Sequence, residues 1–145
     1  MIIENKNIEK ICNFYVSDFH LEMILLPYLN QKLKEEEPVT IISEKNLNQS
    51  IKELISKVNL DNKIKNNILN LEWDSAEIKE IQNNSNVVLI GTENFIEQKK
   101  NKLIDMDVEN LKIIDCYNLQ EVEKDVQKIV LTHDKNLNTL GITNV

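Results

Sequence analysis

Short apolar runs alternate along this chain with longer stretches in which apolar residues recur every three or four positions. The runs are rich in β-branched side chains and continuously apolar, which is typical of strands covered on both faces of a parallel sheet. We predict five strands, at residues 11–16, 39–43, 68–73, 87–90 and 111–116. Because helical patterns separate them, the expected fold is a three-layer α/β sandwich with a mostly parallel five-stranded sheet.

The first helix has the clearest signals. Ser17 or Asp18 can cap it by accepting a hydrogen bond from an amide of the first turn. Pro27 removes one hydrogen bond inside the helix and predicts a kink, and residues 35–38, Glu-Glu-Glu-Pro, predict its end. One apolar face follows helical spacing and comprises Leu21, Leu25, Tyr28, Leu29 and Leu33.

Four further helices are predicted after it. They cover residues 46–58, a short segment from Ser75 through Ile78 and Ile81, a segment capped by Thr92, and residues 119–133. Residues 62–67 and 82–86 are predicted polar connections, and the final ten residues are a loose tail or an edge strand. The 145 residues are expected to form a single domain, 1–145.

Charge narrows the possible partners. The formal net charge is −7, and all seventeen basic residues are lysines. An acidic chain without arginine is a poor match for nucleic acid or an anionic membrane, and it has no guanidinium fork for paired contacts to phosphate. A small-molecule signal, a protein partner or a second copy of the chain remain as expected partners.

The location is expected to be cytoplasmic. Residues 1–7 contain no apolar leader segment, and the longest apolar run, residues 23–26, is too short to cross a bilayer. Cys12 and Cys116 are isolated, each inside a predicted strand, which predicts small buried side chains in a reducing compartment.

In open α/β sheets, ligands bind at the carboxyl ends of the strands, where the loops to the helices meet. In this chain those loops are rich in polar and aromatic residues. Trp73 is either a core residue or a pocket wall, while Tyr15 offers an apolar ring with a polar tip. The predicted ligand-binding residues are Tyr15, Ser17, Asp18, Ser43, Trp73, Gly91 and Thr92.

Catalytic, metal and nucleotide motifs are missing from the sequence. With only two glycines, Gly91 and Gly141, no glycine-rich phosphate loop can be written. No histidine or cysteine recurs at metal-ligand spacing. We therefore predict no cofactor, no metal and no enzymatic activity; a small hydrolase or transferase using Asp18, His20 and Glu44 is a weak alternative.

Three segments carry a family resemblance: Lys-Ile-Cys-Asn-Phe-Tyr-Val-Ser-Asp at 10–18, Leu-Leu-Pro-Tyr-Leu-Asn-Gln-Lys-Leu at 25–33, and Glu-Pro-Val-Thr-Ile-Ile at 37–42. Together they resemble the start of the methanogen/methylotroph DcmR sensory (MEDS) domain family. The chain departs from the family pattern at Lys10, where the family has histidine, and in lacking the glycines near the end of the first helix. The positions that fit are Cys12, Phe14, Tyr15, Pro27, Tyr28, Leu29, Leu33 and Glu37.

The resemblance implies a RecA/Rossmann-like core without a phosphate loop, which senses a small compound and signals to an output domain. Our first hypothesis is therefore a non-enzymatic sensing or regulatory domain that binds a small molecule and acts through a partner. The alternative is a protein-interaction or assembly module that dimerises through the helix around Pro27. A pocket lined by Tyr15, Trp73 and Gly91 would favour sensing, and an exposed apolar helix beside a closed strand-end surface would favour assembly.

Overall fold

The computed structural model describes residues 7–145, so the expectation drawn from residues 1–7 falls largely outside the described residues. A six-stranded sheet forms the centre, in the order β2-β3-β4-β1-β5-β6. All neighbouring strands are parallel except the β5–β6 hairpin. The strands are β1 (Ile8–Tyr15), β2 (Val39–Ser43), β3 (Asn86–Ile90), β4 (Leu111–Asn118), β5 (Lys135–Asn138) and β6 (Gly141–Asn144).

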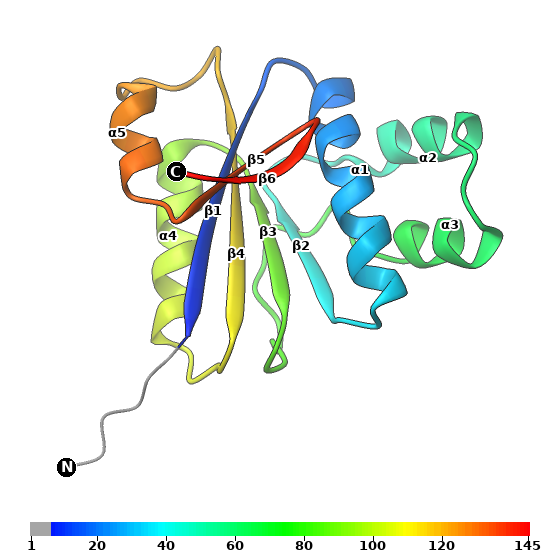
Figure 1. Ribbon diagram of the computed structural model, residues 1–145, viewed down its shortest axis with the longest axis horizontal. Helices are drawn as coiled ribbons and strands as arrows, with labels where there is room; N and C mark the ends of the chain where they lie inside the picture. Colours follow the sequence, from blue (N-terminus) through cyan, green and yellow to red (C-terminus); the bar gives the residue numbers. More distant parts are fainter. Residues whose placement is uncertain (1–6) are drawn as a thin grey trace.

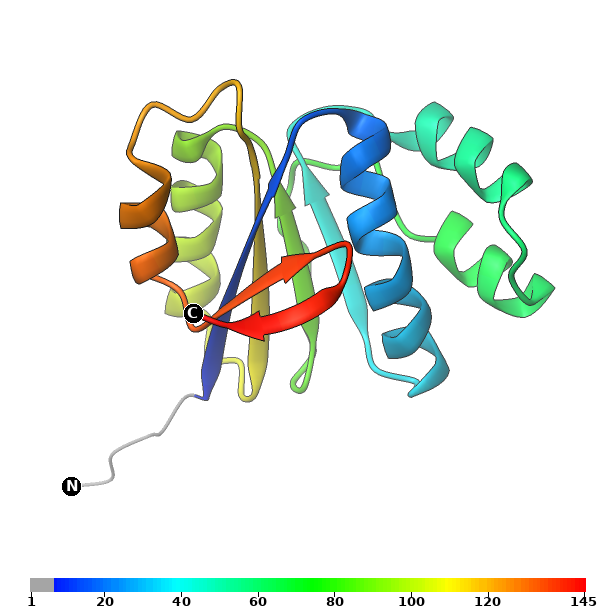
Figure 2. The same ribbon diagram turned by 45° about the horizontal axis from the view of Figure 1, so that its top comes forward.

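Helices cover both faces of this sheet, which confirms the predicted three-layer α/β sandwich (Figure 1). The first face is covered by α1 (Asp18–Lys34), with α2 (Asn48–Lys57) and α3 (Asn62–Leu69) packed beside it. The second face carries α4 (Glu93–Asp105) and α5 (Val126–Leu131), as Figure 2 shows from another angle. Within the described residues, the sheet has one strand more than the sequence predicted.

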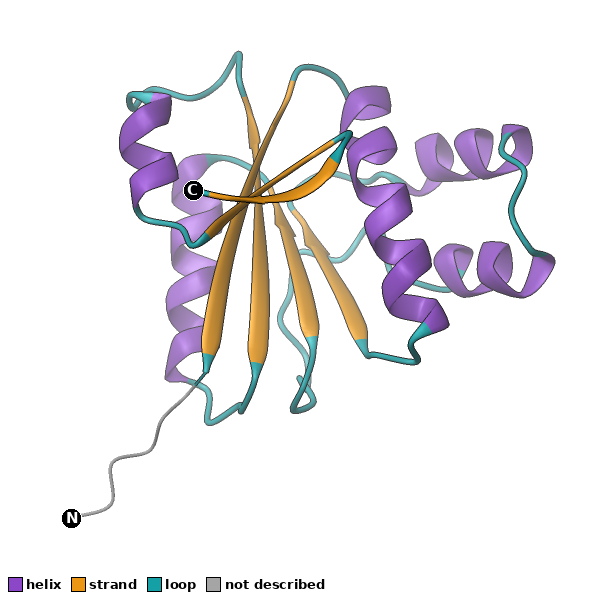
Figure 3. Cartoon of the chain, in the orientation of Figure 1, coloured by secondary structure: helices purple, strands orange, loops and turns teal. Residues whose placement is uncertain are grey.

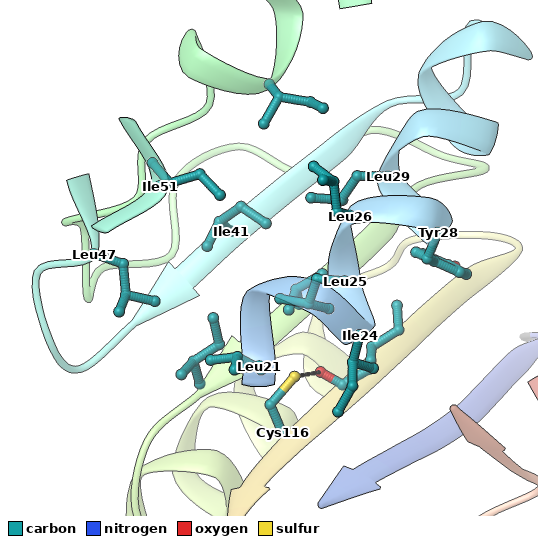
Figure 4. Packing of buried hydrophobic residues seen from close by; sticks show 14 of the residues in the cluster. Leu21, Ile24, Leu25, Leu26, Tyr28, Leu29, Ile41, Leu47, Ile51 and Cys116 are labelled. Atoms are coloured by element: carbon teal, nitrogen blue, oxygen red, sulfur yellow. Dashed lines mark hydrogen bonds between the residues drawn. The ribbon is translucent and has the colours of Figure 1, made fainter. Parts of the chain in front are cut away.

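Each face of the sheet buries its own apolar cluster. On the first face, α1 packs its leucines against β2 and β4, with Leu21 and Ile24 close to Cys116 (Figure 4). Cys12 belongs to the cluster on the second face, so the sheet separates the two thiols. Both cysteines are buried and free, as the sequence predicted.

The ends of α1 follow the predicted signals. The Ser17 side chain accepts a hydrogen bond from the amide of His20 at 3.1 Å and caps the first turn. The helix continues through Pro27, which has no amide hydrogen to offer the carbonyl of Met23. It ends where Glu36 takes a left-handed backbone with φ 59°, a conformation that glycine usually supplies at this position.

The predicted strand at residues 68–73 is wrong. Ile64 and Ile68 lie four positions apart on the buried face of α3, so the apolar pattern there is helical. Asp61 caps α3 by accepting a hydrogen bond from the amide of Lys63 at 2.8 Å, and the predicted polar connection at 62–67 is therefore helix. Trp73 follows this helix in a loop.

Two predicted helices also need correction (Figure 3). Residues 75–85 form no helix, although Ile81 is buried. The carbonyl of Ser75 accepts a hydrogen bond from the amide of Ser43 at 2.9 Å, which holds this segment along β2. The last helix covers only Val126–Leu131, because Asp125 caps it and residues 119–125 are irregular. The helices at 46–58 and after Thr92 are confirmed as α2 and α4, and the final residues form the edge strand β6.

Candidate functional site

Six of the seven predicted ligand-binding residues lie along the carboxyl edge of the sheet. Tyr15 ends β1 and Ser43 ends β2, while Ser17 and Asp18 begin α1. Gly91 and Thr92 connect β3 to α4. The sheet order places β2 and β3 side by side and β1 beyond β4, so these loops share one edge.

A lysine–aromatic contact occupies the part of this edge next to β1. The ammonium group of Lys45 lies 5.2 Å from the ring centroid of Tyr15 and forms an ion pair with Asp18. Burial lowers the pKa of Lys45, but the hydrogen bonds and charges of Asp18 and Tyr15 together outweigh that effect and leave the pKa above its ordinary value. Burial also raises the pKa of Tyr15, so its hydroxyl stays protonated at neutral pH. These groups satisfy one another within the chain.

The loops after β2 and β3 are tied together by a second set of bonds. The Glu44 carboxylate accepts a hydrogen bond from the amide of Thr92 at 3.0 Å, and the amide of Glu44 donates to the carbonyl of Ile90 at 2.8 Å. A methyl group added to Gly91 would lie 2.6 Å from Cδ1 of Phe95 and 3.0 Å from Cβ of Glu44. Gly91 therefore permits the close approach of two loops.

Trp73 does not line this edge. It is completely buried in the core cluster beneath α1, and its indole N–H donates to the carbonyl of Ile68 at 2.8 Å. Of the two predicted roles for this residue, core side chain and pocket wall, the structure supports the core role.

Asp18, His20 and Glu44 do not form a catalytic group with one another. The His20 ring accepts a hydrogen bond from the amide of Val16 at 3.0 Å through Nδ1, while Asp18 and Glu44 bond to Lys45 and Thr92. The hydrolase or transferase alternative depended on convergence of these three side chains. It therefore gains no support from the described residues.

Two cavities lie away from the predicted site residues. One of about 410 Å³ separates α1 from the β5–β6 hairpin, with Pro27 and Ile142 on opposite walls. Another of about 380 Å³ separates α4 from α5 and reaches Tyr117. All seven predicted residues belong to the described part of the chain, and none of them lines either cavity.

The outer face of α1 exposes apolar side chains. Phe19 is 62% exposed and Met23 is 40% exposed, and Pro27 is exposed at the next position of the same four-residue spacing. The turn of the β5–β6 hairpin lies beside this helix and carries Leu140, which is 93% exposed (Figure 2). We refer to Phe19, Met23, Pro27 and Leu140 as the α1 patch.

Sequence reasoning missed a buried polar cluster on the second face. Asp115, in the middle of β4, is completely buried, and one of its carboxylate oxygens contacts His133 at 2.6 Å and Lys100 at 2.7 Å. The signal for it was a carboxylate inside the apolar run from Leu111 to Tyr117, because a buried charge requires a partner. The partners are 15 and 18 residues away, too far for sequence spacing to identify.

Within residues 7–145 no three acidic, histidine or cysteine side chains gather as a metal site would require. In the same residues, no helix has both the length and the apolar character needed to cross a membrane. Comparison with protein-family models, with curated proteins and with solved structures found no match. The resemblance to the MEDS family therefore stays a prediction from the residues quoted above.

Proposed function

We propose that this chain is a protein-interaction module that assembles with a second copy of itself through the α1 patch. The observation that carries the proposal is the exposure of Phe19, Met23 and Pro27 along one line of α1. Single exposed apolar residues are ordinary, but a contiguous group that spans a helix and a neighbouring turn is typical of interaction sites.

The charges around the patch favour a partner with the same surface. Lys45 pairs with Asp18 at the start of α1, and Lys135 pairs with Glu9 on the side of the hairpin. Because these rim charges are neutralised within the chain, two copies related by a two-fold axis would bring no uncompensated like charges together. The paired rim charges reduce the local repulsion between two chains of net charge −7.

The strand-end surface supports the same proposal. The loops after β2 and β3 bond to one another through Glu44 and Thr92, and within the loop after β2 the Ser43 hydroxyl donates to the carbonyl of Lys45 at 2.6 Å. Strand-end loops that bond to one another beside an exposed apolar helix favour assembly over sensing.

The test measures mass in solution for three chains. Sedimentation velocity of the wild type should give a dimer at about 100 µM, a concentration well above the Kd of a micromolar interface. The double variant Phe19→Glu/Met23→Glu should be monomeric. Leu131→Glu, on the opposite face at 70% exposure, is the matched control and should remain dimeric. A monomeric wild type, or a dimer that survives the double substitution, overturns the proposal.

The second candidate is the sensing function, with its ligand at the carboxyl edge. It is favoured by the gathering of Tyr15, Asp18 and Thr92 along that edge. For a ligand found by screening, Tyr15→Phe and Thr92→Ala should weaken binding without unfolding the chain, although loss of the Thr92 cap costs about 1 kcal/mol. A ligand that maps to the opposite edge of the sheet would rule this site out.

A further inference from the structure

The cavity between α4 and α5 gathers positive charge on a chain that is acidic overall. Four lysines line it, Lys10, Lys100, Lys124 and Lys128, against two carboxylates, Glu93 and Glu97. The chain as a whole has a net charge of −7. The local excess of ammonium groups is therefore opposite in sign to the molecule around it.

Within residues 7–145, the lysines of the cavity form no ion pair, with one exception. Among the described residues, neither Lys124 nor Lys128 pairs with a carboxylate. Lys100 is the exception, because the buried Asp115 holds its ammonium group at 2.7 Å. Lys124 and Lys128 are thus free to bind a ligand, while Lys100 has a fixed position at the cavity wall.

The inner wall is aromatic and carries an unused donor. Tyr117 lies in the wall, with its ring stacked on Phe14 at a centroid distance of 5.6 Å and edge-on to His133 at 6.1 Å. Its hydroxyl has no hydrogen-bond partner among the described residues. Burial raises the pKa of Tyr117 well above its ordinary value, so the hydroxyl stays a neutral donor.

We propose that this cavity binds a small molecule through a dianionic group, either a phosphate monoester or a dicarboxylate. Lys124 and Lys128 would supply the opposing charges, and the Tyr117 hydroxyl would donate a hydrogen bond to the anion. Lysine suits this role because its ammonium is a point charge with three donors. A volume of about 380 Å³ lies at the small end of ligand pockets, which favours a metabolite over a peptide.

The two glutamates limit the charge of the ligand. Because Asp115 already neutralises Lys100, three ammonium groups remain against Glu93 and Glu97, and this small excess suits a small anion and leaves no surplus for a polyanion such as nucleic acid. The site is independent of the α1 patch, which lies on the other face of the sheet. Its binding test therefore does not depend on whether the chain dimerises.

The experiment titrates the full chain with inorganic phosphate and, separately, with succinate, followed by amide chemical shifts in NMR. Each titration extends to about 10 mM, which detects a Kd near 1 mM. At least one anion should shift the amides around Tyr117 and Lys128. Binding of phosphate alone assigns the site to phosphate esters, and binding of succinate alone assigns it to dicarboxylates.

Three variants test the residues. Lys124→Gln and Lys128→Gln should each weaken binding roughly tenfold, the expected effect of removing one charge-assisted hydrogen bond. Lys57→Gln, an exposed lysine on α2, changes the net charge equally and should leave the affinity unchanged. Absence of binding by both anions overturns the proposal. It is also overturned if Lys57→Gln weakens binding as much as the cavity variants, or if the cavity variants bind normally.

Discussion

The imidazole of His133 and the carboxylate of Asp115 meet at 2.6 Å in the interior and join the segment before β5 to the middle of β4. The other ring nitrogen, Nδ1, lies 2.7 Å from the carbonyl of Ile129. Since a carbonyl only accepts, Nδ1 carries the hydrogen in this contact. Lys100 donates to the same carboxylate oxygen.

Replacing His133 with alanine should lower the free energy of unfolding by about 3–5 kcal/mol, because it leaves a buried carboxylate with one partner instead of two. Urea denaturation monitored by circular dichroism measures the change. Leu131→Ala, two residues away and largely exposed, is the control and should change stability by less than about 0.5 kcal/mol. A loss below about 1 kcal/mol for His133→Ala would contradict a stabilising role for the pair.

Neither cysteine should react while the protein is folded. Burial, followed by the negative charge of Asp115, raises the pKa of Cys12 to about 11, and burial raises that of Cys116 further. The thiolate is the reactive form, and at pH 8 only about one Cys12 thiol in a thousand is ionised.

Ellman's reagent should therefore label both thiols in urea and leave the native chain unlabelled over minutes. The variant Cys12→Ser isolates the signal of Cys116. Rapid, stoichiometric labelling of the native protein would show that one of the thiols is accessible and activated.

Glu22 should make the stability depend on pH. Burial raises the pKa of this carboxyl above 4.5, more than the hydrogen bond from Ser50 lowers it. The protonated form is favoured in the folded state, so the contribution of Glu22 to stability is full below about pH 4.5 and is lost as pH rises through the folded pKa.

The variant Glu22→Gln stays neutral at every pH. Its unfolding free energy relative to the wild type should therefore increase as pH rises from about 4.5 to 7, as urea denaturation at several pH values would measure. Glu80→Gln, an exposed change in the loop before β3, should give a nearly constant difference. A constant difference for Glu22→Gln as well would mean that this carboxyl is not perturbed by folding.

Replacing Gly91 with alanine should destabilise the chain by about 1–3 kcal/mol, the usual range for added volume in a packed site. The new methyl group would meet the ring of Phe95 at 2.6 Å. Thermal unfolding of Gly91→Ala, Phe95→Leu and the double variant measures the coupling. If the clash is the cause, the double variant should be more stable than the sum of the single changes predicts; simple additivity would argue against it.

The sequence predicts those parts of the fold in which local pattern and tertiary burial agree. The apolar runs of β2, β3 and β4 and the Thr92 cap of α4 are of this kind. The prediction of a strand from Ile68 to Trp73 was wrong because a buried helix turn and the loop after it are as apolar as a strand. Ile81 is buried by the fold without belonging to a helix, which no local periodicity can indicate.

The same limit applies to the candidate sites. Local sequence identifies the strand-end residues, because each lies directly after an apolar run. The lysines of the α4–α5 cavity come from β1, α4 and the region of α5, which are distant in the sequence. They come together only because the chain crosses from one strand to the next through helices on the same face of the sheet. The burial of Asp115 between Lys100 and His133 depends on the same crossing.

The place of β1 in the sheet has a consequence for synthesis on the ribosome. β1 is the first strand of the chain, yet its neighbours in the sheet are β4 and β5, and Asn13 contacts Cys116 across 103 residues. At about 5–20 residues per second, β1 waits roughly 5–20 s before a strand that can pair with it has been made. Throughout that interval its unpaired backbone groups and apolar side chains are available to chaperones and to neighbouring nascent chains.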